Sequence, residues 1–463
     1  MSISFSGMDS KLESTKMEIH VPLTNQFIQL ANALEWRSIQ SIVIEDIKKT
    51  TNKLKWWLGR KLEIRIHLAV FILQLILKTT DREMERAIKY NALYQVFCGK
   101  TIVEKWHCPD HTKIEEFRNR ISPETSQKIV SYVANLAVKN GFADPSKMDV
   151  DSTVQEANMA YPSDAHLLVK LAMMAKKVIN YLQKKRTKIS DLTEGIYVDV
   201  KAVKKIAKDY FFMAKNVSKE VKQKAFKKLY QAVEKEVTSV IGICASVKED
   251  ISKKLPWYIR RTVKQIQEHA KKYLEDVYYF IENQTMKTGK ILSFHLKDVA
   301  CIMKGKLGKT MEFGRIFQLG RIAGNFFIAL PSSEVRQEDR ASILLMVEEH
   351  ENIFGEGILK SLGTDKGYYS KENKINLQKK IEELGIQIPC NVREQHIIDQ
   401  KLKDRRAGIE PLIGHIKDFG LRKSKMKSDK ATLSSGYRSI LGFNLHQFMR
   451  YLTNPKLKLS TQY

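Results

Sequence analysis

The sequence predicts an α+β protein of several domains, in which a helical N-terminal domain precedes a mixed α/β domain that a helical segment interrupts. The length of 463 residues exceeds that of one ordinary domain. Apolar residues recur with the helical period as far as about residue 140, and they alternate with polar residues from 147 to 154. The helical period then returns until about residue 290, where strand-like and helix-like segments begin to alternate.

The boundaries between these parts follow from the changes in pattern. In chain order, we expect a flexible tail at 1–20, the helical N-terminal domain at 21–145, the first part of the α/β domain at 146–160, a helical lysine-rich insertion at 161–290, the remainder of the α/β domain at 291–430 and a C-terminal helix at 431–463. Two helix starts carry capping residues. Thr80 precedes DREMER, and Ser122 precedes PETSQKIV, which places a proline at the first helical position. The C-terminal helix is expected to be amphipathic.

Three segments predict strands of the α/β domain. Side chains alternate between the faces of a strand, so Asp149 and Asp151 in KMDVDSTV are expected on the same face. The runs MEFGRIFQL and GNFFIAL predict a hairpin whose connection is LGRIAG. The apolar segment GILKSLG predicts a strand that ends at Thr364 and Asp365.

The charge balance indicates a polyanionic partner. The chain has 79 Lys and Arg against 52 Asp and Glu, and the net charge of +27 attracts nucleic acid or an anionic membrane surface. Because no apolar run of 18 residues occurs, we expect no membrane association and favour nucleic acid. The N-terminus lacks the pattern of a secretory signal, and the five cysteines are odd in number and scattered, so a cytoplasmic protein is expected.

The helices of the insertion are rich in lysine. Taken singly, each lysine is best explained as part of the solvated face of a helical bundle. Collectively they make this region strongly positive, and Trp257, Tyr258, Arg260 and Arg261 add groups that can stack on bases or bind phosphates.

Three carboxylates are candidates for a catalytic metal site. Asp365 follows an apolar strand, Asp151 lies within another strand, and Glu410 belongs to a late helix, so the three could converge. Carboxylates that cluster repel one another unless a cation lies between them, and their oxygens prefer Mg²⁺ or Mn²⁺. Two such ions about 4 Å apart can activate a water or a 3′-hydroxyl for attack on a phosphodiester. Asp149 is the chief alternative to Asp151. Taken singly, each acid is better explained by structure, Asp365 as a turn residue and Asp151 as an acceptor at a strand end, whereas their order, spacing and basic surroundings together favour the catalytic site.

Basic residues surround Glu410 in RRAGIEPLIGHIK. On an ideal helix Arg406, Glu410 and Lys417 share a narrow sector, so the two cations are expected to contact DNA phosphates beside the metal. Pro411 predicts that the helix starts or kinks at Glu410. Further candidate DNA contacts are Lys304, Lys306 and Arg315.

These motifs resemble those of bacterial insertion-sequence transposases with a DDE, ribonuclease H-like catalytic domain. The spacing Arg406-x3-Glu410-x6-Lys417 is similar to the glutamate signature of that family, although the position of its tyrosine is Lys403 here. VDST with Asp151, the run KGKLGKTMEFGRIFQL, TDKGYYS with Asp365, and GIEPLIGHIK also resemble the family. The segment from TTDREMERAIKY to FRNRIS resembles its helical N-terminal domain.

The resemblance implies a fold and an activity. The parts at 146–160 and 291–430 would form the ribonuclease H-like domain, and 21–145 would bind DNA. Asp151, Asp365 and Glu410 would hold two Mg²⁺ or Mn²⁺ ions that catalyse DNA strand cleavage and strand transfer. The partners would be double-stranded DNA, both terminal inverted repeats and target, bound by a homodimer or higher multimer at the bacterial nucleoid. The alternatives are a non-catalytic basic DNA-binding protein, such as a decayed transposase, and a metal-dependent DNA nuclease.

Overall fold

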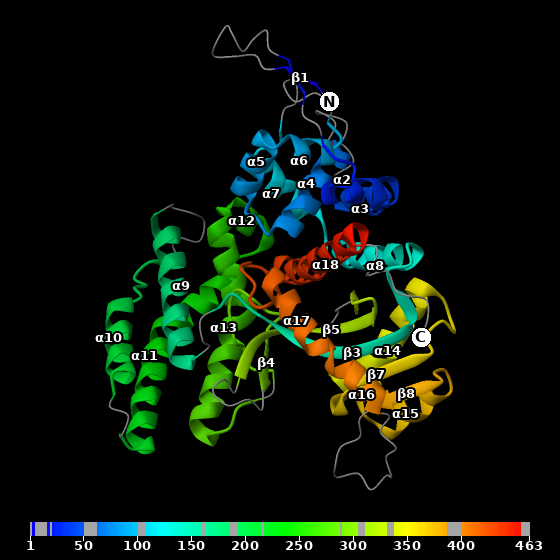
Figure 1. Ribbon diagram of the computed structural model, residues 1–463. Helices are drawn as coiled ribbons and strands as arrows, with labels where there is room; N and C mark the ends of the chain where they lie inside the picture. Colours follow the sequence, from blue (N-terminus) through cyan, green and yellow to red (C-terminus); the bar gives the residue numbers. More distant parts are fainter. Residues whose placement is uncertain are drawn as a thin grey trace. The chain divides into compact units, whose positions relative to one another are not determined.

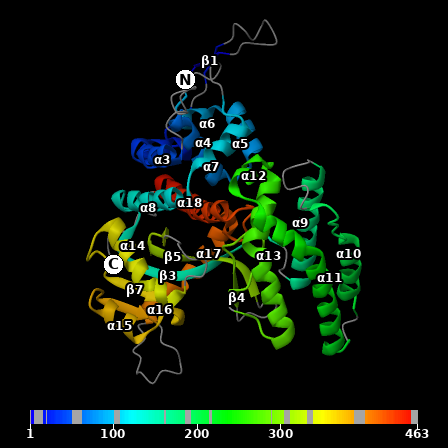
Figure 2. The same cartoon turned by 180° about the vertical axis from the view of Figure 1, so that it is seen from behind.

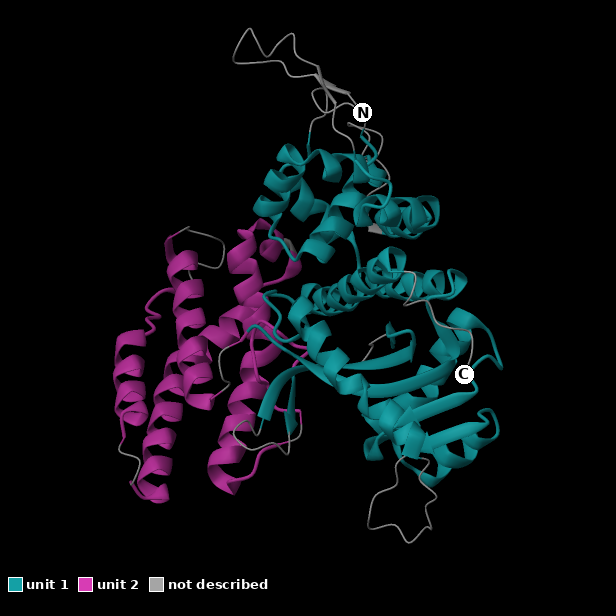
Figure 3. Ribbon diagram, viewed as in Figure 1, with its two compact units in different colours: residues 1–158, 300–463 teal, residues 159–299 magenta. Residues whose placement is uncertain are grey.

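The chain folds into two compact units. The computed structural model describes residues 2–4, 16–18, 21–50, 63–100, 108–159, 163–184, 193–213, 217–287, 289–303, 311–330, 338–386 and 400–454. The first unit combines residues 1–158 with 300–463, and the second is 159–299 (Figure 3). The second unit therefore covers the stretch for which the sequence predicts a helical insertion at 161–290.

The N-terminal part of the first unit is helical (Figure 1). Its helices are α2 (Gln26–Ala33), α3 (Trp36–Thr50), α4 (Ile64–Leu77), α5 (Asp81–Tyr90), α6 (Ala92–Phe97), α7 (His111–Arg120) and α8 (Pro123–Lys139). Within the segment predicted as a tail, the short strands β1 (Ser2–Ser4) and β2 (Lys16–Glu18) pair antiparallel. Both predicted helix starts are confirmed. Thr80 forms a capping box with Glu83, and the Ser122 hydroxyl accepts a hydrogen bond from the Thr125 N–H at 3.1 Å.

A mixed sheet follows. Its strands are β3 (Asp144–Glu156), β4 (Ala300–Met303), β5 (Met311–Ala323), β6 (Phe326–Ala329), β7 (Ser361–Thr364) and β8 (Glu383–Ile386). The order is β4-β5-β3-β7-β8, with β6 also paired to β5. The central strand β3 is antiparallel to β5 and parallel to β7, and β7 is parallel to β8. The described chain is thus mixed α/β, mostly helical, with one mixed sheet.

The predicted hairpin forms, but its turn was placed wrongly. Strand β5 continues through most of LGRIAG, since Leu319 pairs with Ala329 and Ile322 with Phe326. The turn consists of Gly324 and Asn325, which have φ of +93° and +64°. Ile322 and Phe326 form the last pair, so three residues connect them, and the Asn325 N–H donates to the Ile322 carbonyl at 3.1 Å. Glycine and asparagine are the residues that adopt a positive φ at low cost.

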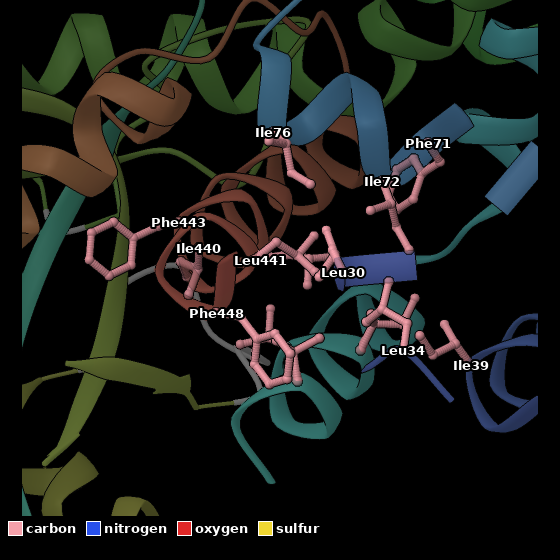
Figure 4. Close-up of a cluster of buried hydrophobic side chains, with 14 of the residues drawn as sticks. Leu30, Leu34, Ile39, Phe71, Ile72, Ile76, Ile440, Leu441, Phe443 and Phe448 are labelled. Atoms are coloured by element: carbon pink, nitrogen blue, oxygen red, sulfur yellow. The ribbon is translucent and has the colours of Figure 1, made fainter. Parts of the chain in front are cut away.

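Helices cover both faces of the sheet. On one face, α14 (Asp339–Phe354) packs over Met148, Val150 and Leu362. On the other face, α8 and the C-terminal helix α18 (Asp429–Thr453) enclose residues of β5 and β6 in a large core that also contains α2–α4 (Figure 4). The helix α18 is buried around most of its circumference, so the expectation of an amphipathic helix was wrong. The reason is that it is covered by the N-terminal helices on the side away from the sheet.

A buried asparagine couples α18 to the edge of the sheet. The Asn444 side chain donates to the Phe327 carbonyl at 2.8 Å and accepts from the Phe327 N–H at 3.0 Å. Close approach is possible because α18 has glycine at 436, where an added Cβ would lie 2.1 Å from the Phe317 ring. These contacts hold β5 and β6 against α18. The candidate site lies on the other side of β3, where this strand pairs with β7.

The second unit is a helical bundle with its own core (Figures 2 and 3). Its helices are α9 (Asp164–Lys184), α10 (Val200–Phe211), α11 (Lys219–Ser246), α12 (Glu249–Lys254) and α13 (Trp257–Asn283). Apolar residues of α9, α10, α11 and α13 form the buried cluster, and most lysines lie on outer faces. In neither unit is any described helix long and apolar enough to cross a membrane.

Candidate active site

Two of the three predicted acids meet where β3 and β7 run side by side. The parallel register pairs Lys147 with Ser361 and Asp149 with Gly363. Continued by two residues, the same register sets Asp151 opposite Asp365, which directly follows the last residue of β7. The Asp365 carboxylate also accepts a hydrogen bond from the Gly367 N–H at 2.8 Å, which orients it at the strand end.

The third acid, Glu410, lies just after a break between two helices. Helix α16 (Gln400–Ala407) ends before Gly408, and α17 (Ile409–Ile416) begins with Glu410 and Pro411 in its first turn. A proline is tolerated there because the first-turn N–H has no partner within the helix. The predicted start or kink is confirmed, and one continuous ideal helix from Arg406 to Lys417 is wrong.

One guanidinium group joins the three acids. Arg406 donates from NH2 to Asp151 Oδ2 at 3.1 Å and from NH1 to Glu410 Oε1 at 3.2 Å. Its NH2 also lies 3.6 Å from Asp365 Oδ2. Only 13% of the Arg406 side chain is exposed, whereas Glu410 is 65% exposed. The two aspartates and the glutamate therefore converge on a position that a cation already fills.

Asp149 has a different environment from its neighbour on the strand. It is 2% exposed, and its two oxygens accept hydrogen bonds from Arg321 on β5 at 2.5 Å and from Arg405 on α16 at 2.9 Å. The Arg405 guanidinium also donates a hydrogen bond to the Ser361 hydroxyl at 2.8 Å, which fixes its position. Space for this ion pair depends on Gly363, where an added Cβ would lie 2.5 Å from Asp149 Oδ1. Asp149 is thus fully neutralised by protein groups.

The electrostatic balance at Asp151 favours protonation. Burial raises the pKa of the Asp151 carboxyl to about 6, and the like charges of Asp365 and Glu410 add to this rise. Arg406 and the hydrogen bond from the Ser152 N–H lower the pKa but do not cancel the effect of burial. A raised pKa in a cluster of like charges is a feature of functional sites, and structural ion pairs also produce it.

A fourth carboxylate, Asp339, was missed from the sequence. It begins α14, and its Oδ1 accepts a hydrogen bond from Gln318 at 2.7 Å. Burial raises its pKa, and Asp365 contributes to that rise. A Cβ at Gly367 would lie 2.9 Å from Asp339 and 3.2 Å from Asp365, so both acids flank this glycine. In the sequence Asp339 resembles any acid in a first helical turn, and only the register of β5 reveals its position.

A pocket of about 500 Å³ opens beside Asp339. Its lining includes Ser152 and Thr153 of β3, Met303 of β4, Arg340 and Gly367. Glu338 and Asp339 also line it, so the pocket gives solvent an approach to Asp339.

Of the described residues that were predicted to contact DNA, Arg406 lies at the three acids, and Lys417 and Arg315 lie elsewhere in the first unit. Arg406 is directed at the acids. Lys417 is half-buried at the start of the five-residue π-helical segment η3 (Lys417–Leu421). Arg315 is 4% exposed on β5, opposite Gln155. Lys304 and Lys306 lie outside the described residues.

The donor set is suitable for a hard cation. Asp151, Asp365 and Glu410 offer carboxylate oxygens alone, which Mg²⁺ and Mn²⁺ prefer. Among the described residues, no three His, Cys, Asp or Glu side chains are already arranged closely enough to share a metal ion. The Arg406 guanidinium lies within 3.6 Å of an oxygen of each of the three carboxylates, so ions held here would have to displace it.

Part of the chain is similar to known proteins. Residues 16–120 match the family model described as "Transposase domain (DUF772)". A protein of Rhizobium meliloti, described as "Uncharacterized protein ORF8 in nfe locus", is 26% identical over 113 residues, which cover 24% of this chain and 55% of that protein. The chain thus spans about half the length of this curated relative. No solved structure matches the chain. The N-terminal helical part of the chain is thus similar to a transposase domain.

The first prediction concerns the buried ion pair. Asp149→Asn leaves Arg321 and Arg405 without their buried counter-charge, so we expect the free energy of unfolding to fall by about 3–5 kcal/mol. Urea unfolding followed by circular dichroism measures it. The control is Asp418→Asn, because Asp418 is exposed and pairs with the exposed Arg422. A loss at Asp149 no larger than the control's would show that this acid is not the structural one.

The second prediction concerns pH. Because the pKa of Asp151 is raised from 3.8 to about 6 in the folded protein, its protonated form stabilises the fold. That contribution is complete below about pH 4 and is lost as the pH rises through 6. Asparagine cannot ionise, so in EDTA the stability of Asp151→Asn relative to wild type should increase between pH 4 and 7, by up to about 3 kcal/mol. Urea titrations at each pH measure this difference. A difference that does not change with pH would contradict the assignment.

Proposed function

We propose that the chain is a DDE transposase of an insertion sequence, which cleaves DNA strands and joins them to target DNA with two Mg²⁺ or Mn²⁺ ions. The observation that carries the proposal is the convergence of Asp151, Asp365 and Glu410 on one guanidinium, from two parallel strands and a later helix. The match of residues 16–120 to a transposase domain supports it independently.

The sheet supports a ribonuclease H-like catalytic domain. A sequence of this class should have its first acid on a central strand and its second at the end of the neighbouring parallel strand. Strands β3 and β7 have these positions, and the antiparallel strands β4, β5 and β6 follow on the other side of β3. The long insertion separates β3 from the remainder, as the resemblance implies.

The carboxylates Asp151, Asp365 and Glu410 would hold the ions. Bound there, the ions would activate a water or a 3′-hydroxyl and stabilise the leaving oxygen of the phosphodiester. Asp151 must lose its proton to serve as a ligand, so its raised pKa predicts weaker ion binding below about pH 6. Asp149 remains bound to its two arginines and holds β3, β5 and α16 in register.

Arg406 has two roles in this proposal. Without bound ions its guanidinium neutralises the three acids, which would otherwise repel one another. A guanidinium also binds phosphate through two parallel hydrogen bonds. Arg406 would therefore exchange carboxylates for a DNA phosphate, with Lys417 on the next helical segment as a second contact. In this way the acids become available when DNA is present.

The DNA partners proposed are the terminal inverted repeats and a target duplex. The matched domain at 16–120 would recognise the repeats, and the net charge of +27 favours DNA binding in general. Strand transfer requires two element ends to be held together, so a homodimer or higher multimer on DNA is proposed.

The third prediction is a strand-transfer assay. Purified protein is incubated with a labelled duplex that carries the flanking repeat of its own element and with a supercoiled target, in Mg²⁺ or in EDTA. We expect joined products that require Mg²⁺. Asp151→Ala, Asp365→Ala and Glu410→Ala should each reduce the rate by at least about 10³-fold, because each removes a ligand of the ions that stabilise the transition state. The control Asp418→Ala should leave the rate unchanged.

The other outcomes of this assay separate the alternatives. Mg²⁺-dependent cleavage without joining would indicate a nuclease. DNA binding without cleavage, unchanged by the three substitutions, would indicate a non-catalytic DNA-binding protein and would overturn the proposal.

The fourth prediction tests Arg406 as the internal counter-ion. In EDTA, Arg406→Gln leaves the three acids without their cation, so we expect a lower melting temperature, by about 2–4 °C for each kcal/mol lost. Mg²⁺ should then raise the melting temperature of this variant more than that of wild type, because no side chain competes for the oxygens. Differential scanning calorimetry measures both shifts. Arg422→Gln, which removes an exposed arginine, is the control, and an equal Mg²⁺ shift in all three proteins would refute the competition.

A further inference from the structure

The second unit contains a groove between α9 and α10 that has no role in the site described above. Two adjoining hollows of about 360 and 350 Å³ lie along the seam of these helices, and Met173 and Lys204 line both. Apolar residues such as Val169 and Ala207 form the base, and lysines form the rims. We call this feature the α9–α10 groove.

Positive charge is concentrated along this groove. The two helices carry lysines at 170, 176, 177, 184, 201, 204, 205 and 208. Their acids are Asp164, which is paired with Lys290 at 2.6 Å, and Asp209, and neither lines a hollow. Lys204 and Lys208 are four residues apart and so lie on one face, about one helical turn of 5.4 Å from each other.

Aromatic rings lie at one end of the groove. His166 stacks on Phe211 with ring centroids 4.2 Å apart, and the next residue, Phe212, is 79% exposed. Lys208 lies 5.9 Å from the centre of the Phe212 ring. A large ring so exposed beside cations is unfavourable in water but provides a surface on which an unpaired base can stack.

We propose that the α9–α10 groove binds a single strand of DNA. The lysines on its rims would contact successive phosphates, and Phe212, with the His166–Phe211 pair, would stack on unpaired bases. In a duplex the base faces are covered by neighbouring pairs, so this combination of rings and lysines fits a separated strand better than a double helix. An acidic protein segment would use the lysines and leave the rings without a stacking partner. The choice of DNA rather than RNA rests on the proposed function.

The fifth prediction measures this binding with the full chain in EDTA, so that no metal-dependent cleavage can consume the probe. The probe is a labelled oligothymidylate of about 16 nucleotides, and its affinity is measured by fluorescence anisotropy at several salt concentrations. Lys204→Gln with Lys208→Gln should weaken binding at least fivefold and reduce the slope of log affinity against log salt by about 1.4. Phe212→Ala should weaken binding at least about fivefold with little change in that slope.

The matched control is Lys224→Gln with Lys228→Gln, which removes the same charge from exposed positions on α11. We expect it to stay within about twofold of wild type. Weakening by the groove variants alone supports the proposal. Equal effects of both lysine pairs, or no effect of Phe212→Ala, would overturn it and indicate a diffuse polyanion-binding surface or an acidic protein partner.

Failure of the groove proposal can be distinguished from failure of the transposase proposal, because binding by the groove and strand transfer are measured separately. Strand transfer by a protein whose groove variants bind like the control would refute the groove alone. Groove-dependent binding in a protein that neither cleaves nor joins DNA would refute the transposase proposal alone.

Discussion

The first unit depends on neutralising the acids that one face of β3 buries. Asp149 and Asp151 are two residues apart on this strand, roughly 6.6 Å, and burial removes most of the solvent that would stabilise their charge. Two consecutive residues of α16, Arg405 and Arg406, provide the counter-charges. Arg405 is also hydrogen-bonded to Ser361, so it fixes the helix against β3 and β7 together. Once Arg405 is fixed, its neighbour is held over Asp151, and α17 brings Glu410 to the same point.

The two ion pairs are unequal, and this difference separates structure from chemistry. Asp149 has two arginines and is almost completely buried, which is the arrangement that makes a buried charge tolerable. Asp151 shares one arginine with two other acids, and the Nε of Arg406 has no hydrogen-bond partner among the described residues. A polar network that is only partly satisfied costs stability. Such a cost is expected where the network must accept a further ligand, such as a cation.

Much of this site could be predicted from the sequence because its signals are local. Strand alternation put Asp149 and Asp151 on one face, and the apolar run before Asp365 predicted a strand end. The partners could not be predicted, because they depend on pairing between distant segments. Arg321 reaches Asp149 through the register of β5 with β3, and Asp339 lies near Asp365 because α14 packs against β5, where Gln318 donates to Asp339. The turn at Gly324 could not be predicted either, because pairing with β6 extends β5 beyond the apolar run that marked it in the sequence.

The position of the second unit in the chain also follows from strand pairing. The chain leaves the sheet after Glu156 at the end of β3 and returns at Ala300 at the start of β4, and both residues pair with Gly314 of β5. The two ends of the insertion are therefore separated by two strand spacings, about 10 Å. Gly314 permits this close pairing, since an added Cβ would lie 2.0 Å from the Gln155 carbonyl oxygen. Because the cost of closing a loop depends mainly on the distance between its ends and only weakly on its length, a folded bundle can be inserted here without disturbing the register that positions Asp151.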